Sequence, residues 1–263
     1  MQIRDDKNMQ NFIGILPCGG QATRLRPFKY PKQLLPVAYT KPNKDGNSYP
    51  ILAAEYSLRC MRLAGIQKCV ITTHDWKPEI LRYFGDGHEF GMSIAYVCQE
   101  EAKSMPQALD LAYEWVKDKY VALAWPDTLF EPSDAFNQLC NKISKETADL
   151  VLGAFPNVNP DSSFPVYHDK NGSVYEVKLR PKTTKFKNTC GLAIWSPKFT
   201  EFLHKNIYSE GKKEEQQIMN LFAQAIKEGF KVSAVDFKKG SYTDLGIVSG
   251  LGSLLINSKS IHF

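Results

Sequence analysis

Residues 14–27 read GILPCGGQATRLRP, where an apolar run ends in paired glycines and continues into threonine and arginine. Glycine has no side chain, so the backbone can approach an anion closely and turn its N–H groups toward it. Arg24 and Arg26 supply positive charge just after the glycines, and PKQLLPV at residues 31–37 adds Lys32 between two prolines. The pattern predicts an anion-binding loop, but it matches neither a Walker loop nor the Rossmann fingerprint, whose third glycine is missing.

Short apolar runs and amphipathic stretches alternate around this loop through the first 150 residues. The runs predict buried strands at Phe12–Leu16, Cys69–Thr73, Ile94–Cys98, Val121–Ala124 and Leu150–Phe155. Helical spacing predicts helices at Ile51–Leu63, Pro78–Phe84, Gln107–Val116 and Ser133–Ser144, the last capped by Ser133. We therefore expect an α/β fold with a Rossmann-like, mostly parallel sheet flanked by helices.

The second half of the chain shows a different pattern. It predicts strands at Phe164–His168, Ser173–Leu179, Thr189–Trp195 and Lys231–Asp236, and helices at Pro197–Asn206, Glu214–Glu228 and Ile247–Asn257. No repeat and no linker separates the halves. We expect one domain over residues 1–263, with a core over about 12–155 and a small β-rich lobe over about 156–263.

The composition limits which class of ligand and which cellular compartment we expect for this protein. A net charge of +5 suits an anionic ligand, but the basic residues are spread out, so no nucleic-acid partner is expected. The six cysteines form no CxxC pair and are typical of reduced thiols in a cytoplasmic protein. No apolar run is long enough to span a membrane, and the polar start of the chain lacks a signal core.

The glycine loop and the PKQLLPV segment together resemble the signature of sugar-1-phosphate nucleotidyltransferases, which is Gly-Gly-x-Gly-Thr-Arg-Leu-x-Pro followed by Pro-Lys-x-Leu-Leu-Pro-Val. The similarity is closest to glucose-1-phosphate thymidylyltransferases. Further motifs of the family follow in the same order: LAGI at 63–66, GDG at 85–87, QEE at 99–101, PDT at 126–128 and YTDLG at 242–246. Each motif alone is weak, but the ordered set covers nearly the whole chain.

The resemblance implies transfer of a nucleoside monophosphate from a nucleoside triphosphate to a phosphorylated acceptor, with release of pyrophosphate. Such a reaction depends mainly on positioning and on charge neutralisation. By resemblance, Arg24 would stabilise the departing pyrophosphate and Lys32 would contact the α-phosphate. The triphosphate would be held by backbone N–H groups of the loop, which consists of Cys18, Gly19, Gly20, Gln21, Ala22 and Thr23.

Two carboxylates are expected to bind Mg²⁺. Asp127 follows the strand Val121–Ala124, at the carboxyl end where open α/β sheets bind ligands. The spacing of the two residues in the sequence does not show that Asp244 lies next to Asp127. Only the family resemblance implies that they are neighbours. A pair of carboxylates suits a hard cation that also bridges phosphates.

The base site rests on Gln99, with Ser104 placed beside it in the nucleotide site. In the family, a glutamine at the position of Gln99 reads a pyrimidine edge. A primary amide can donate and accept, so it pairs with uracil or thymine in one orientation and with cytosine in the other. UTP, dTTP and CTP therefore all remain open.

The acceptor side departs most from the family. Leu179-Arg180-Pro181 stands where Glu-Lys-Pro is usual. Arg180 can still bind a phosphate, but Leu179 cannot accept a hydrogen bond from a sugar hydroxyl. We therefore expect glucose 1-phosphate to be a poor acceptor, unless Glu176 supplies the missing carboxylate from the same strand.

Two other interpretations remain open. One is a cytidylyltransferase whose acceptor is a phosphorylated amino acid, amino alcohol or phosphonate, which Leu179 favours. The other is an inactive nucleotide-binding regulatory protein, disfavoured by the joint presence of Arg24, Lys32, Asp127 and Asp244. Only 19 residues follow Asp244, so the family's tetramer and feedback control are not carried over, and a homodimer is kept open.

Overall fold

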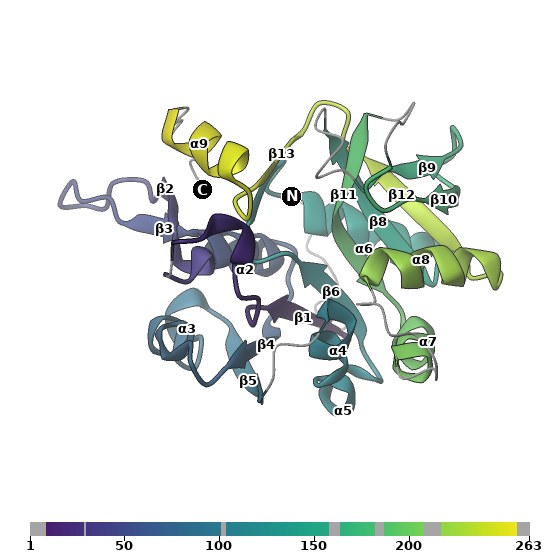
Figure 1. The fold of residues 1–263 in the computed structure, drawn as a ribbon, viewed down its shortest axis with the longest axis horizontal. Coiled ribbons are helices and arrows are strands. Elements are labelled where there is room, and N and C mark those ends of the chain that lie inside the picture. The colour runs from purple at the N-terminus through teal and green to yellow at the C-terminus, as the bar shows by residue number, and fades with distance from the viewer. Residues whose placement is uncertain are drawn as a thin grey trace.

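The structure is a computed structural model, which describes residues 9–28, 30–100, 104–157, 164–181, 187–207 and 217–256. In these residues the main sheet has seven strands, in the order β12-β8-β11-β6-β1-β4-β5 (Figure 1). The strand bounds are β1 Phe12–Pro17, β4 Lys68–His74, β5 Ser93–Gln99, β6 Tyr120–Ala124, β8 Leu150–Pro156, β11 Asn188–Trp195 and β12 Val232–Asp236. All neighbouring strands are parallel except β11, which runs antiparallel to β6 and β8.

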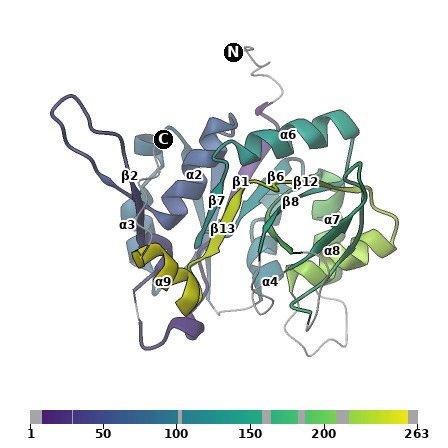
Figure 2. The same cartoon turned by 90° about the horizontal axis from the view of Figure 1, so that it is seen from above.

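Helices cover both faces of this sheet, as Figure 2 shows. Strand side chains alternate between two hydrophobic cores, so that Phe12 joins one core and Ile13 the other. The first core packs against α2 Ala53–Leu63, α3 Pro78–Phe84 and α6 Ala135–Glu146. The second packs against α4 Met105–Asp110, α5 Tyr113–Val116, α7 Pro197–Ile207 and α8 Ile218–Lys227. The predicted α/β fold is confirmed.

Three two-stranded antiparallel sheets complete the described strands. They pair β2 Pro36–Tyr39 with β3 Pro50–Leu52, β9 Val166–His168 with β10 Val174–Val177, and β7 Thr128–Glu131 with β13 Ser241–Asp244. The remaining elements are α9 Val248–Ile256 and the short 3-10 helices η1 Thr23–Leu25, η2 Lys32–Leu34 and η3 His88–Phe90. The strands β2, β3, β7 and β13, which have three or four residues each, were not predicted.

Some predicted helix bounds differ from the structure. The helix predicted at Gln107–Val116 is broken at Ala112, whose ψ of 3° leaves the helical region. Ile51 and Leu52 belong to β3 because they pair with β2. The cap of α6 is Asp134 rather than Ser133, with no side-chain hydrogen bond. One predicted helix starts at Glu214 and another ends at Asn257, and both of these residues lie outside the described ones. None of the described helices has the length and apolar character needed to cross a membrane.

Candidate active site

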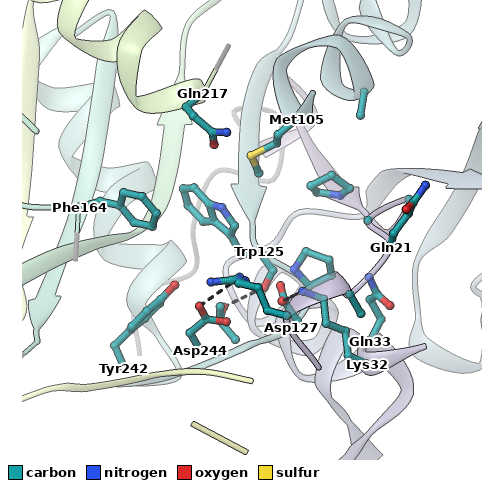
Figure 3. A pocket seen from close by; sticks show the side chains of 18 of the residues that line it. Gln21, Lys32, Gln33, Met105, Trp125, Asp127, Phe164, Gln217, Tyr242 and Asp244 are labelled. Carbon is teal, nitrogen blue, oxygen red and sulfur yellow. Dashed lines mark hydrogen bonds and ion pairs between the residues drawn. The ribbon is translucent and has the colours of Figure 1, made fainter. Parts of the chain in front are cut away.

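A cavity of about 500 Å³ opens at the carboxyl ends of β1, β5 and β6. Its lining includes glycine-loop residues with Arg24, Lys32, Gln33, Gln99 and Asp127, and also Trp125, Phe164, Arg180, Gln217, Tyr242 and Asp244. In Figure 3, Asp127 and Asp244 lie close together, with Phe164 and Tyr242 on the opposite side from Gln21 and Gln33. This is the place where open α/β sheets bind ligands. The predicted triphosphate and metal residues thus meet in one cavity.

The pairing of β7 with β13 brings Asp127 and Asp244 together. Asp127 lies just before β7, and Asp244 ends β13 opposite Thr128. The backbone N–H of Leu245 donates to the carbonyl of Asp127 over 2.9 Å, which fixes the two segments beyond the strand ends. Burial, and then the neighbouring Asp127 charge, raise the pKa of Asp244. Asp127 is buried and Asp244 is largely buried, so their neighbouring negative charges favour a bound cation.

The carboxylate pair fits Mg²⁺ by its donor chemistry. Both groups offer hard oxygen ligands, and no cluster of three or more His, Cys, Asp and Glu occurs among the described residues. Mg²⁺ is usually held by one or two carboxylates and completes its shell with water and phosphate oxygens. Asp127 and Asp244 are therefore the residues that would hold the ion.

Two cations lie next to these carboxylates (Figure 3). Lys32, largely buried on η2, forms an ion pair with Asp127. The Arg24 guanidinium lies 3.7 Å from an Asp244 oxygen and is about half exposed. The four residues predicted for catalysis and metal binding therefore form one charged cluster, in which cation and carboxylate alternate.

The charged cluster leaves no room for a side chain at Gly246. A Cβ atom built on Gly246 would lie 2.8 Å from each of Asp127 Oδ2, Asp244 Oδ1 and Lys32 Nζ. Its N–H also donates to Asp244 Oδ1 over 2.7 Å. Close approach, rather than an unusual backbone angle, is the requirement for glycine here.

We expect Gly246→Ala to lower turnover by about a hundredfold while the protein stays folded, because a displacement near 1 Å in the reacting groups has an effect of that size. Steady-state kinetics with a thermal unfolding curve would measure both. Gly252→Ala is the matched control, since open space surrounds that position. Unchanged turnover in Gly246→Ala would show that the two carboxylates do not act together.

The glycine loop is anchored beneath the cavity. Cys18 is fully buried, its N–H donates to the carbonyl of Thr72, and its own carbonyl accepts from Gln33 Nε2. Burial raises the pKa of Cys18 to about 12, so the residue is a neutral packing thiol. Gly19, Gly20, Gln21 and Ala22 line the cavity. Of Thr23, only the backbone is described, at the start of η1.

Ala22 adopts a left-handed backbone conformation, with φ of 52°. The family resemblance places a glycine at this position, and glycine is the residue that adopts this conformation without strain. We expect Ala22→Gly to stabilise the protein by about 0.5–1 kcal/mol, net of the extra entropy of the unfolded chain. Chemical denaturation would measure the change. A lower free energy of unfolding in the variant would contradict it.

Gln99 lies at the end of β5, directly beside the glycine loop. Its amide nitrogen would lie 2.2 Å from a Cβ on Gly19, so glycine at that position lets the amide reach the cavity. The side chain is buried, and its Oε1 has no hydrogen-bond partner among the described residues. Ser104 does not line the cavity but caps α4, its N–H donating to Gln107 Oε1 over 3.1 Å. Gln99 thus presents a buried amide oxygen that no described protein group uses.

The predicted acceptor residues separate in the structure. Arg180 lines the cavity and lies over the Phe164 ring at 5.6 Å. Leu179 and Glu176 are not among its lining residues, and Glu176 instead pairs with Lys178 at 3.2 Å. Trp125 and Phe164 line the cavity but were not predicted from the sequence as site residues. A signal existed for Trp125 alone, since it directly precedes the PDT motif.

Several glucose-1-phosphate thymidylyltransferases are among the relatives of this chain. A glucose-1-phosphate thymidylyltransferase of Mycolicibacterium smegmatis is 31% identical over 65% of this chain and 56% of its own length. One of Neisseria meningitidis is 28% identical over 82% of this chain and 72% of its own length. The chain thus spans little more than half of the first relative.

Solved structures show the same fold. A Bacillus anthracis protein provisionally named a glucose-1-phosphate thymidylyltransferase, crystallised with sucrose, has a TM-score of 0.81 at 21% identity, covering 96% of this chain and 97% of its own. A UDP-glucose pyrophosphorylase in complex with UDP-glucose has a TM-score of 0.73 at 19% identity, covering 92% and 96%. The model of the family described as nucleotidyl transferase matches residues 13–256. Because that match covers most of the sequence, the chain belongs to the nucleotidyl transferase family.

Proposed function

We propose that this protein is a Mg²⁺-dependent nucleotidyltransferase that moves a pyrimidine nucleoside monophosphate from a nucleoside triphosphate to a phosphorylated small molecule such as a sugar 1-phosphate, releasing pyrophosphate. The observation that carries the proposal is the cluster of Arg24, Lys32, Asp127 and Asp244 in one cavity beside the glycine loop. In this proposal residues 12–155 hold the nucleotide and residues 156–263 hold the acceptor, within one domain.

The chain's own residues account for the charge changes of the reaction. An acceptor phosphate oxygen attacks the α-phosphorus, and the bond to the pyrophosphate oxygen breaks in line with it. Lys32 contacts the α-phosphate, where two anions must approach each other, and Arg24 stabilises the pyrophosphate as its charge grows. Asp127 and Asp244 would hold a Mg²⁺ ion, which would supply further neutralisation of the phosphate charge.

The nucleotide half favours a pyrimidine because Gln99 presents a buried amide beside the glycine loop. The buried, unpartnered Oε1 atom is costly unless a ligand donates to it. The N3–H group of uracil or thymine is such a donor, as is the amino group of cytosine. The proposal therefore keeps UTP, dTTP and CTP as donors.

The acceptor half leaves room for a second candidate. From residues 156–263 the described lining carries Phe164, Arg180 and Tyr242, and Trp125 of the nucleotide half lines the same cavity. The carboxylates of this cavity are the proposed metal residues Asp127 and Asp244. A phosphorylated amino alcohol, amino acid or phosphonate would bind its phosphorus group at Arg180 and its body against the rings. A sugar 1-phosphate could stack on the same rings, so the acceptor must be tested directly.

The test is pyrophosphate release with UTP, dTTP and CTP, each against glucose 1-phosphate, galactose 1-phosphate, phosphocholine, phosphoethanolamine and 2-aminoethylphosphonate. We expect acceptor-dependent release with one pyrimidine nucleotide at least about tenfold faster than with ATP or GTP, the factor given by 1.4 kcal/mol of base discrimination. Release that is independent of every acceptor would contradict the proposal.

A further inference from the structure

Lys77 is a buried lysine that lies under the glycine loop. It is the residue before α3 and is only 3% exposed. Its ammonium group donates to the carbonyl of Cys18 over 2.7 Å and to the carbonyl of Gly20 over 2.5 Å. It also lies 4.9 Å from the centre of the Trp76 ring. Within the described part of the chain, its hydrogen-bond acceptors are these two carbonyl oxygens.

The two carbonyls determine where the loop's N–H groups point. In a planar trans peptide, the carbonyl of one residue and the N–H of the next point in opposite directions. The peptides after Cys18 and Gly20 are trans, since the described cis bonds precede Pro27 and Pro132. Holding both carbonyls down toward Lys77 therefore turns the N–H groups of Gly19 and Gln21 away from it.

These N–H groups are free to bind a ligand. Among the described residues, neither Gly19 nor Gln21 donates its backbone N–H to any protein atom. Both residues line the cavity, and the ideal Cβ position of Gly20 between them has open space around it. Backbone N–H groups that face one space form an anion site.

We propose that Lys77 is a positioning residue of the nucleotide site, which holds the Cys18 and Gly20 carbonyls so that the Gly19 and Gln21 N–H groups point at the triphosphate. This inference rests on the proposed function for the identity of the anion. Lys77 touches neither substrate nor reacting atoms. Its positive charge lies behind the loop, where it also favours an anion in front of it.

The decisive experiment compares Lys77→Met with Lys77→Arg, and uses Lys68→Met as a control because Lys68 is exposed on β4. UTP, CTP and dTTP are each titrated with Mg²⁺, and the amide resonances of Gly19 and Gln21 are followed. We expect the Met variant to bind the preferred nucleotide at least about tenfold more weakly, as for loss of a charge-assisted hydrogen bond. The two amide shifts should be lost in that variant and restored by arginine, while acceptor KM changes less than twofold.

The pH dependence gives a second readout that does not need the Met variant to fold. Burial lowers the pKa of Lys77 to about 8, so its charge is present below that pH and is lost above it. Wild-type nucleotide affinity should fall between pH 7.5 and 9.5, whereas Lys77→Arg should stay flat because arginine keeps its proton. The charged or titratable groups that face Lys77 are Cys18, Lys32, His74, Glu79 and Asp127.

Two results would overturn the role of Lys77. One is Lys77→Met binding within twofold of wild type with both amide shifts intact, and the other is identical pH profiles for wild type and Lys77→Arg. A wild-type protein that binds nucleotide but transfers none to any acceptor contradicts the proposed function instead. The same binding data then still decide the role of Lys77.

Discussion

Asp127→Asn and Asp244→Asn are each expected to lower turnover by at least about a thousandfold, because each removes one of the two protein charges proposed to hold Mg²⁺. The two carboxylates converge on the same space around Gly246. Amide oxygens preserve the shape of the site but supply no negative charge. Steady-state turnover across a Mg²⁺ titration would measure the loss together with a weaker apparent metal affinity.

An exposed aspartate separates this effect from a general loss of charge. Asp118 is exposed between α5 and β6, so Asp118→Asn should retain wild-type turnover. Thermal unfolding should show that both active-site variants stay folded. Relief of the repulsion between Asp127 and Asp244 should make Asp244→Asn slightly more stable without metal, whereas Asp127→Asn also removes the ion pair to Lys32. Near-normal Mg²⁺-dependent turnover in either variant would remove that residue from the metal site.

Lys32→Met is expected to lower kcat by about a hundredfold to a thousandfold while changing nucleotide affinity much less, because its charge matters most when the acceptor phosphate approaches the α-phosphate. Lys32 is largely buried and already pairs with Asp127, so its ammonium is held in place before substrate binds. Single-turnover rates and an equilibrium titration would separate the two quantities.

Lys41→Met is the matched control for that variant, since Lys41 is exposed between β2 and β3. If Lys32→Met raised only the nucleotide dissociation constant and left kcat unchanged, Lys32 would be a ground-state binding residue. Its place beside the α-phosphate would then be wrong.

The main sheet was predictable because most of its strands are apolar runs, and β1, β4, β6, β8 and β11 are buried along nearly their whole length. The predicted strand Cys69–Thr73, for example, extends by one residue at each end in β4. The β7 and β13 strands were not predictable in the same way. They have four residues each, are partly polar, and pair across a long sequence separation. Only this pairing explains in physical terms why Asp127 and Asp244 meet.

Contacts between residues far apart in the sequence also limit which parts of the site could be predicted. The glycine loop carries a local signal, whereas Lys77 lies 59 residues from Cys18 and nothing in its own segment indicates the contact. Leu179 and Arg180 are adjacent in sequence, yet only Arg180 lines the cavity. Both residues lie beyond the end of β10, and Arg180 has φ of 41°, so a strand pattern does not predict which of the two side chains enters the cavity.

The central claim is transfer of the α-phosphoryl group with its nucleoside, and labelled nucleotide tests it most directly. The wild-type protein would be mixed with Mg²⁺, its best acceptor and the preferred pyrimidine triphosphate, labelled with ³²P at either the α or the γ position. The account predicts that α label enters the acceptor product and that γ label appears only in pyrophosphate, in equal amounts. Transfer of γ label to the acceptor, or α label recovered only as free nucleoside monophosphate, would contradict it.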